Sequence, residues 1–318
     1  MATEGGRPAF PGGARFAFSI FDDADDATVA NSAPVYRLLA EHRIRTTKSV
    51  WVYPPRGLST GESLLDPSYR LWIEQLIAEG FEIGLHNVGD GSFDRREILA
   101  GLDIFREVVG NDPRVHANHV SNPDCIYWWD RRFEWPVSLA YRIAYRLIHG
   151  RLRRQRGEDP TSPHFWGDAC KDRVRYIRNL TFNDIDTLRR DPRMPYRVRS
   201  KASYSNLWFS SSDGQKIAEM RDLLAPANLD ALEARGGVSI VYTHFAAGFV
   251  DDSGVVDPVF RERIADLASR RGWFVPVGTL LDYLAESRPT DDPGYRYRLA
   301  RNGRWIVDRV VKWRRYRH

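Results

Sequence analysis

The feature that most constrains the fold is a regular alternation of short apolar runs with amphipathic segments. Runs of strand length and composition occur at 15–21, 47–53, 81–85, 114–115, 174–182, 238–243 and 273–277. Helical periodicity fills most of the intervals, at 34–42, 69–79, 95–109, 216–224, 258–270 and 280–286. This order is typical of an α/β protein, and roughly six or seven such units favour a (β/α) barrel. An open doubly wound sheet is the alternative, although no glycine-rich phosphate loop follows the first strand.

Composition excludes several other classes of protein. The 318 residues are 42% hydrophobic, enough to bury a substantial core, so global disorder is excluded. Two cysteines, Cys125 and Cys170, are too few for a disulfide scaffold. No apolar run approaches the ~18 residues of a membrane span, and the first residues contain no secretory h-region. A cytoplasmic location is therefore expected.

The net charge of +5 is unevenly distributed. Residues 294–318 carry nine Lys/Arg and one acid, and residues 131–156 carry eight Arg and one acid. Such runs can meet nucleic acid, a membrane surface or an acidic substrate. No recognised nucleic-acid module accompanies them, so no nucleic-acid partner is expected.

The two basic regions also depart from the strand–helix alternation. Residues 125–157 read as an insertion with a helix at 136–154, whose apolar stripe we expect to pack on the main fold. Residues 291–318 read as a basic amphipathic tail, with Ile306, Val310 and Trp313 on one side of a helix and an Asp308–Lys312 pair. The tail predicts peripheral contact with anionic lipid at the inner face of the membrane through 294–318; a solvated helix packed on the barrel is the alternative.

Ionisable and polar side chains follow four of the predicted strands. They are Asp22, Asp23, His86, His116, Asn118, His119 and His244. In α/β barrels the carboxyl ends of the strands converge on one rim, where active sites are built. Each residue alone has a structural reading, such as a turn, a helix cap or a packed histidine. Together they predict a site.

The chemistry of this set fits a mononuclear metal hydrolase. Catalytic zinc takes about three nitrogen or oxygen ligands from the protein and keeps a position open for water. One carboxylate and two imidazoles would supply the ligands, and a second carboxylate would serve as base. A histidine on the opposite side, such as His244, would protonate the leaving group.

Several segments in order resemble the polysaccharide deacetylase family (NodB homology, carbohydrate esterase family 4). They are FSIFDD, TTKSVWVY, LIAEGFEIGLHNVGDGS, IVYTHF and WFVPVGTLLDYLAE. The resemblance spans about 15–286 and is interrupted by the insertion. It implies a distorted (β/α) barrel of the glycoside hydrolase/deacetylase type over 1–290, containing the insertion 125–157 and followed by the tail 291–318.

The resemblance also implies metal-dependent removal of an acyl group, in particular acetyl, from a sugar. Asp22 matches the family's base, Asp23 its metal-binding aspartate, His86 its first metal histidine and His244 its catalytic acid. The implied cofactor is a divalent metal ion, zinc.

The chain departs from the family at the second metal histidine, where it has Asp90. Asp90 is an alternative ligand, although its neighbours also suit a turn. We expect His119, or alternatively His116, to complete the ligand set. Asn118 and Asn122 are then expected to touch the substrate.

A later segment, HFWGDACKDRVRYIRNL, adds further candidates. Trp166 and Asp168 are expected to cap the substrate cleft, with an ordinary turn as the alternative. Arg178 would orient a catalytic carboxylate or form a structural ion pair.

These observations predict a bacterial hydrolase of cell-surface polysaccharide or glycolipid biosynthesis. Its substrate would be an acylated saccharide, lipid-linked or nucleotide-linked. Two alternatives remain: a catalytically inactive barrel that binds glycan or a partner protein, and a metal-dependent hydrolase of phosphoester or glycosidic bonds.

Overall fold

The computed structural model describes residues 10–150 and 155–316. The predicted domain, insertion and tail therefore extend beyond the described residues at 1–9, 151–154 and 317–318. Eight strands lie in the described part of the chain: β1 Phe16–Asp22, β2 Thr47–Val50, β3 Glu82–Leu85, β4 Val115–His116, β5 Tyr176–Phe182, β6 Leu207–Asp213, β7 Val238–Thr243 and β8 Gly272–Phe274.

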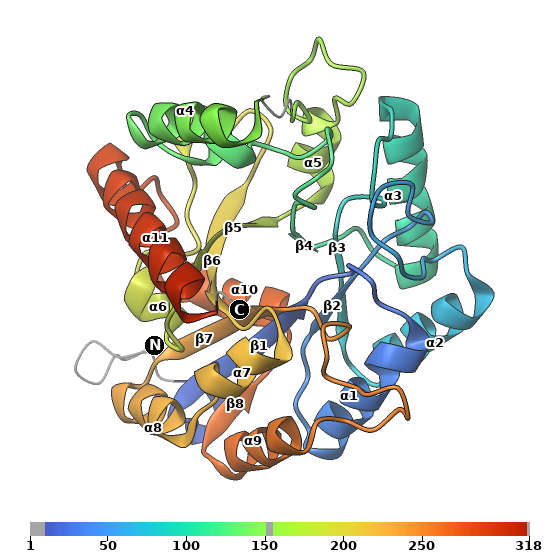
Figure 1. Cartoon of the computed structure of the whole chain (residues 1–318), viewed down its shortest axis with the longest axis vertical. Helices are drawn as coiled ribbons and strands as arrows, with labels where there is room; N and C mark the ends of the chain where they lie inside the picture. The colour runs from blue at the N-terminus through green and yellow to red at the C-terminus, as the bar shows by residue number, and fades with distance from the viewer. Residues whose placement is uncertain (1–9, 151–154, 317–318) are drawn as a thin grey trace.

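All of these strands pair in parallel, in the order β2-β3-β4-β5-β6-β7-β1-β8. β1 also pairs with β2, which closes the ring (Figure 1). β2 meets only the end of β1, at Phe21 and Asp22, while β8 meets its beginning, from Phe16 to Phe18. The barrel is thus distorted at this seam. The predicted barrel is confirmed, and the open-sheet alternative does not hold.

Most of the helices surround this ring, and α10 lies across one end of it (Figure 1). The helices are α1 Val29–Glu41, α2 Pro67–Ala78, α3 Arg95–Val109, α4 Val137–His149, α5 Gly167–Arg173, α6 Thr187–Arg190, α7 Ile217–Leu223, α8 Pro226–Arg235, α9 Pro258–Ser269, α10 Val277–Ser287 and α11 Tyr295–Arg315. None of the helices among the described residues is both long and apolar enough to cross a bilayer.

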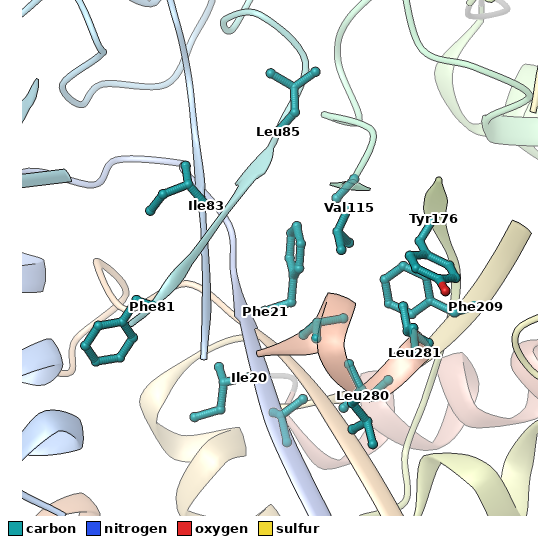
Figure 2. Packing of buried hydrophobic residues seen from close by; sticks show 14 of the residues in the cluster. Ile20, Phe21, Phe81, Ile83, Leu85, Val115, Tyr176, Phe209, Leu280 and Leu281 are labelled. Atoms are coloured by element: carbon teal, nitrogen blue, oxygen red, sulfur yellow. The ribbon is translucent and has the colours of Figure 1, made fainter. Parts of the chain in front are cut away.

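A continuous apolar core fills the barrel below the rim. Figure 2 shows Phe21 of β1 and Phe209 of β6 packed with Leu280 and Leu281 of α10. The backbone N–H of Val277 donates to Thr47 Oγ1 at 2.9 Å, so α10 begins beside the amino end of β2. Because α10 closes the amino end of the barrel, the carboxyl ends of the strands are left for polar side chains.

One strand escaped the sequence patterns. β6 reads LWFSSSD, a polar segment outside the predicted strands, yet all of it is buried. Its serines have partners inside the protein: Ser210 Oγ donates to Asp191 at 2.6 Å, and Ser212 Oγ lies 2.7 Å from Thr187 Oγ1. Hydrogen bonds of this kind offset the cost of burying a hydroxyl, so a strand need not be apolar.

Both basic segments differ from their predicted packing. The apolar stripe of α4 is exposed rather than packed on the barrel, and no residue of α4 is buried. In α11, Asp308 pairs with Arg304 at 3.1 Å instead of Lys312. Lys312 Nζ reaches Asp213 on β6, at 2.9 Å. For Lys312, tertiary partners therefore replace the pairing expected within the helix.

Candidate active site

Three histidines from three strands surround one carboxylate at the carboxyl end of the barrel. Asp25 Oδ1 lies 2.7 Å from His119 Nε2, and Asp25 Oδ2 lies 3.1 Å from both His86 Nε2 and His244 Nε2. His86 directly follows β3, His244 follows β7, and His119 lies three residues beyond β4. The strand ends thus converge as predicted, but on Asp25, a residue that the sequence analysis did not assign to the site.

A turn between β1 and α1 presents Asp25. The N–H of Ala27 donates to the carbonyl of Ala24 at 3.1 Å. Asp26 adopts a left-handed φ of 57°, which aspartate tolerates better than most residues. Its Oδ1 accepts from the N–H of Thr60 at 2.7 Å, which fastens the turn to the neighbouring loop. The turn therefore holds Asp25 over the rim.

The environment of His86 determines which ring nitrogen faces Asp25. Its Nδ1 lies 3.0 Å from the carbonyl oxygen of Ala117, which can only accept a hydrogen bond. Nδ1 therefore carries a proton, and Nε2 is the ring nitrogen that faces Asp25. The buried indole of Trp51 stacks on the ring of His86, with 6.5 Å between ring centroids, and meets the ring of His119 edge-on, with 5.5 Å between centroids. Trp51 thus limits the movement of both rings.

His119 is oriented in a similar way, by an amide. Its Nδ1 lies 3.1 Å from Oδ1 of Asn122, which also accepts from the N–H of Gly91 at 2.8 Å. Nδ2 of Asn122 donates to the carbonyl of Gly89 at 2.7 Å, which confirms the direction of the amide. Nε2 of His119 consequently faces Asp25. Hydrogen bonds of this kind on the remote nitrogen are typical of metal-binding histidines.

The donor set therefore fits a metal ion. Asp25, His86 and His119 each offer one ligand atom, and these three atoms lie within 4.8 Å of one another. Asp23, Asp25 and His244 form a second such group. A carboxylate with two imidazoles is a common protein ligand set for catalytic zinc. Asp25 belongs to both groups, so it is the central candidate ligand.

Asp23 is held by a buried arginine. Arg178 donates from Nη1 to Oδ1 at 2.7 Å and from Nη2 to Oδ2 at 2.5 Å, and its guanidinium lies over the rings of Tyr242 and Phe21. Burial alone would raise the pKa of Asp23, but Arg178 and the neighbouring histidines lower it. Oδ2 lies 3.7 Å from His244 Nε2 and 3.8 Å from His86 Nε2. Asp23 is thus an ionised carboxylate beside the cluster.

Asp22 lies deeper and is fully enclosed. Its Oδ2 accepts from Lys48 Nζ at 2.9 Å and from the Tyr36 hydroxyl at 3.1 Å, and its Oδ1 accepts from the N–H of Phe245 at 2.8 Å. Burial raises its pKa despite the nearby Lys48 ammonium. Both oxygens of Asp22 therefore accept hydrogen bonds from other groups of the protein. The bond from the N–H of Phe245 anchors the loop that carries His244.

The cluster opens toward solvent on one side. The side chains of Asp25 and His244 are 22% and 13% exposed, whereas those of His86 and His119 are almost fully buried. Burial would raise the pKa of Asp25, but the three histidines hold it well below its usual range. Burial would lower the pKa of His244, but Asp25 and Asp23 raise it. A substrate would approach over Asp25 and His244.

Three other predicted residues lie behind the cluster. Asp90 is on the remote side of His119, with Oδ1 3.5 Å from Nδ1, and accepts from the N–H of Ser59 at 2.8 Å. His116 is fully buried, 3.3 Å from Asn118 Oδ1, and burial lowers its pKa to about 3. Asn118 is buried and bonded through both amide atoms to the backbone of Ile126. These three residues support the rim.

The remaining predicted residues also bind the protein itself. Asn122 is buried behind His119, with the contacts described above. Trp166 is buried and donates from Nε1 to the carbonyl of Asp124 at 2.6 Å. Asp168 accepts two hydrogen bonds from Arg95, each 2.7 Å, on an exposed part of α5. Neither Trp166 nor Asp168 contacts the cluster residues in these bonds.

Asn122 offers a test of how the site is supported. We expect Asn122→Ala to weaken binding of a divalent metal by about 10–100-fold, because His119 loses an acceptor that orients its ring. Isothermal titration with Zn²⁺ measures the effect. Asn228→Ala is the matched control: its side-chain amide donates to the carbonyls of Asp222 and Leu223 at the end of α7, and this change should leave metal affinity intact. Equal affinities for all three proteins would contradict the role of Asn122.

The fold and site together define a (β/α) barrel with a carboxylate–histidine cluster at its carboxyl rim. No family model and no curated protein matches the sequence. Among solved structures, Puue allantoinase shares 12% identity with a TM-score of 0.53, covering 89% of this chain and 94% of its own. A probable polysaccharide deacetylase from Pseudomonas aeruginosa PAO1 shares 12% identity with a TM-score of 0.51, covering 89% of this chain and 95% of its own. The fold implied by the sequence resemblance is thereby confirmed.

Proposed function

We propose that this protein is a metal-dependent hydrolase that removes an acyl group, in particular acetyl, from a sugar. The observation that carries the proposal is the position of Asp25, whose carboxylate meets Nε2 of three histidines at an open rim. The fold shared with a probable polysaccharide deacetylase supports the same reaction class. An inactive binding barrel has less support, because packing alone does not require four ionisable groups to converge.

Asp25, His86 and His119 would hold the metal, for which zinc suits the nitrogen and oxygen donors. When bound, a divalent ion in such a site polarises a carbonyl and lowers the pKa of water. We assign to Asp25 the metal-binding role that the family resemblance implied for Asp23, because both oxygens of Asp23 accept hydrogen bonds from Arg178. Asp90 and His116 are not needed as ligands.

Asp23 would act as the base, in place of Asp22. Its Oδ2 lies within 4 Å of two histidines of the cluster, whereas Asp22 lies deeper, among Lys48, Tyr36 and the N–H of Phe245. Arg178 fixes the plane of the Asp23 carboxylate, and a base must be held within hydrogen-bond reach of the proton that it removes. Asp22 instead positions His244 through Phe245.

His244 would donate a proton to the leaving amine or alkoxide. It borders the exposed side of Asp25, whereas His86 and His119 pack on the buried ring of Trp51. A substrate entering over Asp25 would therefore meet the base at Asp23 and the acid at His244. The enclosed side of the cluster excludes bulk water from the back of the site.

We further propose that residues 1–290 carry this activity and that the substrate is a lipid-linked or nucleotide-linked saccharide of bacterial cell-surface glycan assembly. This places the protein in the cytoplasm at the inner face of the membrane. The basic tail 291–318 supports this placement, together with the surface of α4 described below.

The test is release of acetate from a panel of N-acetyl and O-acetyl sugars by the Zn²⁺-loaded protein. Chelation should lower the rate by about 10²-fold or more, because the metal supplies several kcal/mol of stabilisation in such sites, and readdition of Zn²⁺ should restore it. The panel should include allantoin, a phosphomonoester and an aryl glycoside. Turnover of one of these without acetate release would contradict the acyl-sugar assignment, and no turnover with metal bound would favour a binding protein.

A further inference from the structure

Helix α4 exposes an apolar stripe. Leu139, Ile143 and Leu147 recur every four residues, and the last two are 52% and 81% exposed. The opposite face is the one that packs: Tyr141 lies 5.1 Å from Phe133 and 6.2 Å from Trp305, between ring centroids. An amphipathic helix normally turns its aliphatic side toward the core. Here that side faces outward.

The charge on α4 has one sign only. Arg142 and Arg146 are exposed and lie one turn apart along the edge of the apolar stripe. No acid occurs within Val137–His149. Trp135, just before the helix, is 67% exposed. Aliphatic side chains, an indole and arginines on one exposed face form the pattern of helices that lie in a membrane interface.

Helix α11 lies beside α4 (Figure 1). Two of its cations turn inward: Arg309 pairs with Asp213, and Lys312 pairs with Glu219 at 2.8 Å. Aliphatic side chains that include Val307 and Val310 turn outward. Part of the tail's charge is therefore used within the protein, while Arg314 and Arg315 stay exposed, and the helix adds aliphatic side chains to the surface.

Both helices cover the outside of the carboxyl half of β5. Leu180 and Phe182 of β5 pack with Phe133 and with Trp305 of α11. Arg178, which holds Asp23, lies on the same strand. The exposed surface of α4 and α11 is therefore close to the rim of the barrel that carries the cluster.

We propose that this surface, with α4 leading, docks on an anionic lipid bilayer. A bilayer offers apolar chains next to negatively charged headgroups, which match the stripe and the arginine edge together. A second copy of the chain fits less well, because pairing α4 with itself would bring arginines against arginines. Docking does not depend on the proposed reaction, and it would hold the rim near a substrate anchored in the membrane.

The test is flotation of the full chain with vesicles of equal parts phosphatidylcholine and phosphatidylglycerol. The wild type should float with these vesicles and not with phosphatidylcholine alone, and rising salt should weaken its binding. Ile143→Glu with Leu147→Glu, and separately Arg142→Glu with Arg146→Glu, should each lower the partition coefficient by about tenfold or more. Leu71→Glu is the matched control, since Leu71 is 57% exposed on α2, and it should float like the wild type.

Circular dichroism and thermal melting test whether each variant is folded. We expect all of them to fold, because the replaced side chains are exposed. The arginine pair provides an independent test if the glutamate pair in the stripe fails to fold. Wild-type protein that stays unbound on anionic vesicles would overturn the proposal. So would variants that float like the wild type. If light scattering shows a dimer that Leu147→Glu dissociates, and the protein does not bind vesicles, the surface would be assigned to contact with a second copy of the chain. Acetate release from a soluble sugar, measured in parallel, separates this result from the hydrolase proposal.

Discussion

Asp25→Asn should abolish metal binding and activity together. The change keeps the size of the side chain but removes the charge that meets His86, His119 and His244. We expect kcat/KM to fall by about 10³-fold or more, since a loss of about 4 kcal/mol of transition-state stabilisation corresponds to that factor. Metal content by mass spectrometry of the purified protein should fall in parallel.

Asp23→Asn separates the two carboxylate roles. As the base, Asp23 should be needed for turnover, so its variant should lose about 10²–10⁴-fold in rate while keeping its metal. Asp230→Asn, at a 68% exposed position on α8, serves as the control and should change neither property. Loss of metal from Asp23→Asn with retention by Asp25→Asn would restore the assignment that the sequence resemblance implied.

Arg178→Met should cause the largest loss of stability. The Arg178–Asp23 pair is buried on both sides, so removing the cation leaves an uncompensated carboxylate inside the barrel. Breaking a buried pair in this way costs about 3–5 kcal/mol. Urea denaturation measures the change in the free energy of unfolding. Activity should fall as well, because Asp23 loses the group that orients it.

The Arg95–Asp168 pair provides a matched control with the same two-bond geometry at the surface. Arg95→Met should cost about 1 kcal/mol or less, since solvent screens exposed pairs. Combining Arg178→Met with Asp23→Leu should recover part of the lost stability, because no unpaired charge then remains. If Arg178→Met proved no more destabilising than Arg95→Met, the buried pair would not stabilise the barrel as argued.

Much of the fold could be predicted from local pattern. The buried strand β7 was expected at 238–243 and lies at Val238–Thr243, and α3 was expected at 95–109 and lies at Arg95–Val109. Both have strong periodicity or continuous apolar runs. β6 could not be predicted, because hydroxyl groups of Ser210 and Ser212 meet partners that are remote in sequence.

The site could be predicted in part. Residues that follow strands directly, such as His86 and His244, could be placed at the rim because a parallel barrel brings strand ends together. Asp25 could not be distinguished from Asp22 and Asp23 in the run DDADD. Which of them faces the histidines depends on the turn at Ala24–Ala27 and on the partners of each carboxylate, Lys48 for Asp22 and Arg178 for Asp23.

The sequence by itself determined the alternation of strands and helices, the barrel class and the set of histidines available at its rim. These properties follow from periodicity and chain order, which are local. Only the tertiary structure decided which carboxylate meets the histidines and which face of α4 is exposed. Both depend on contacts between residues far apart in the chain, such as Arg178 with Asp23 and Tyr141 with Trp305, and such contacts leave no local pattern.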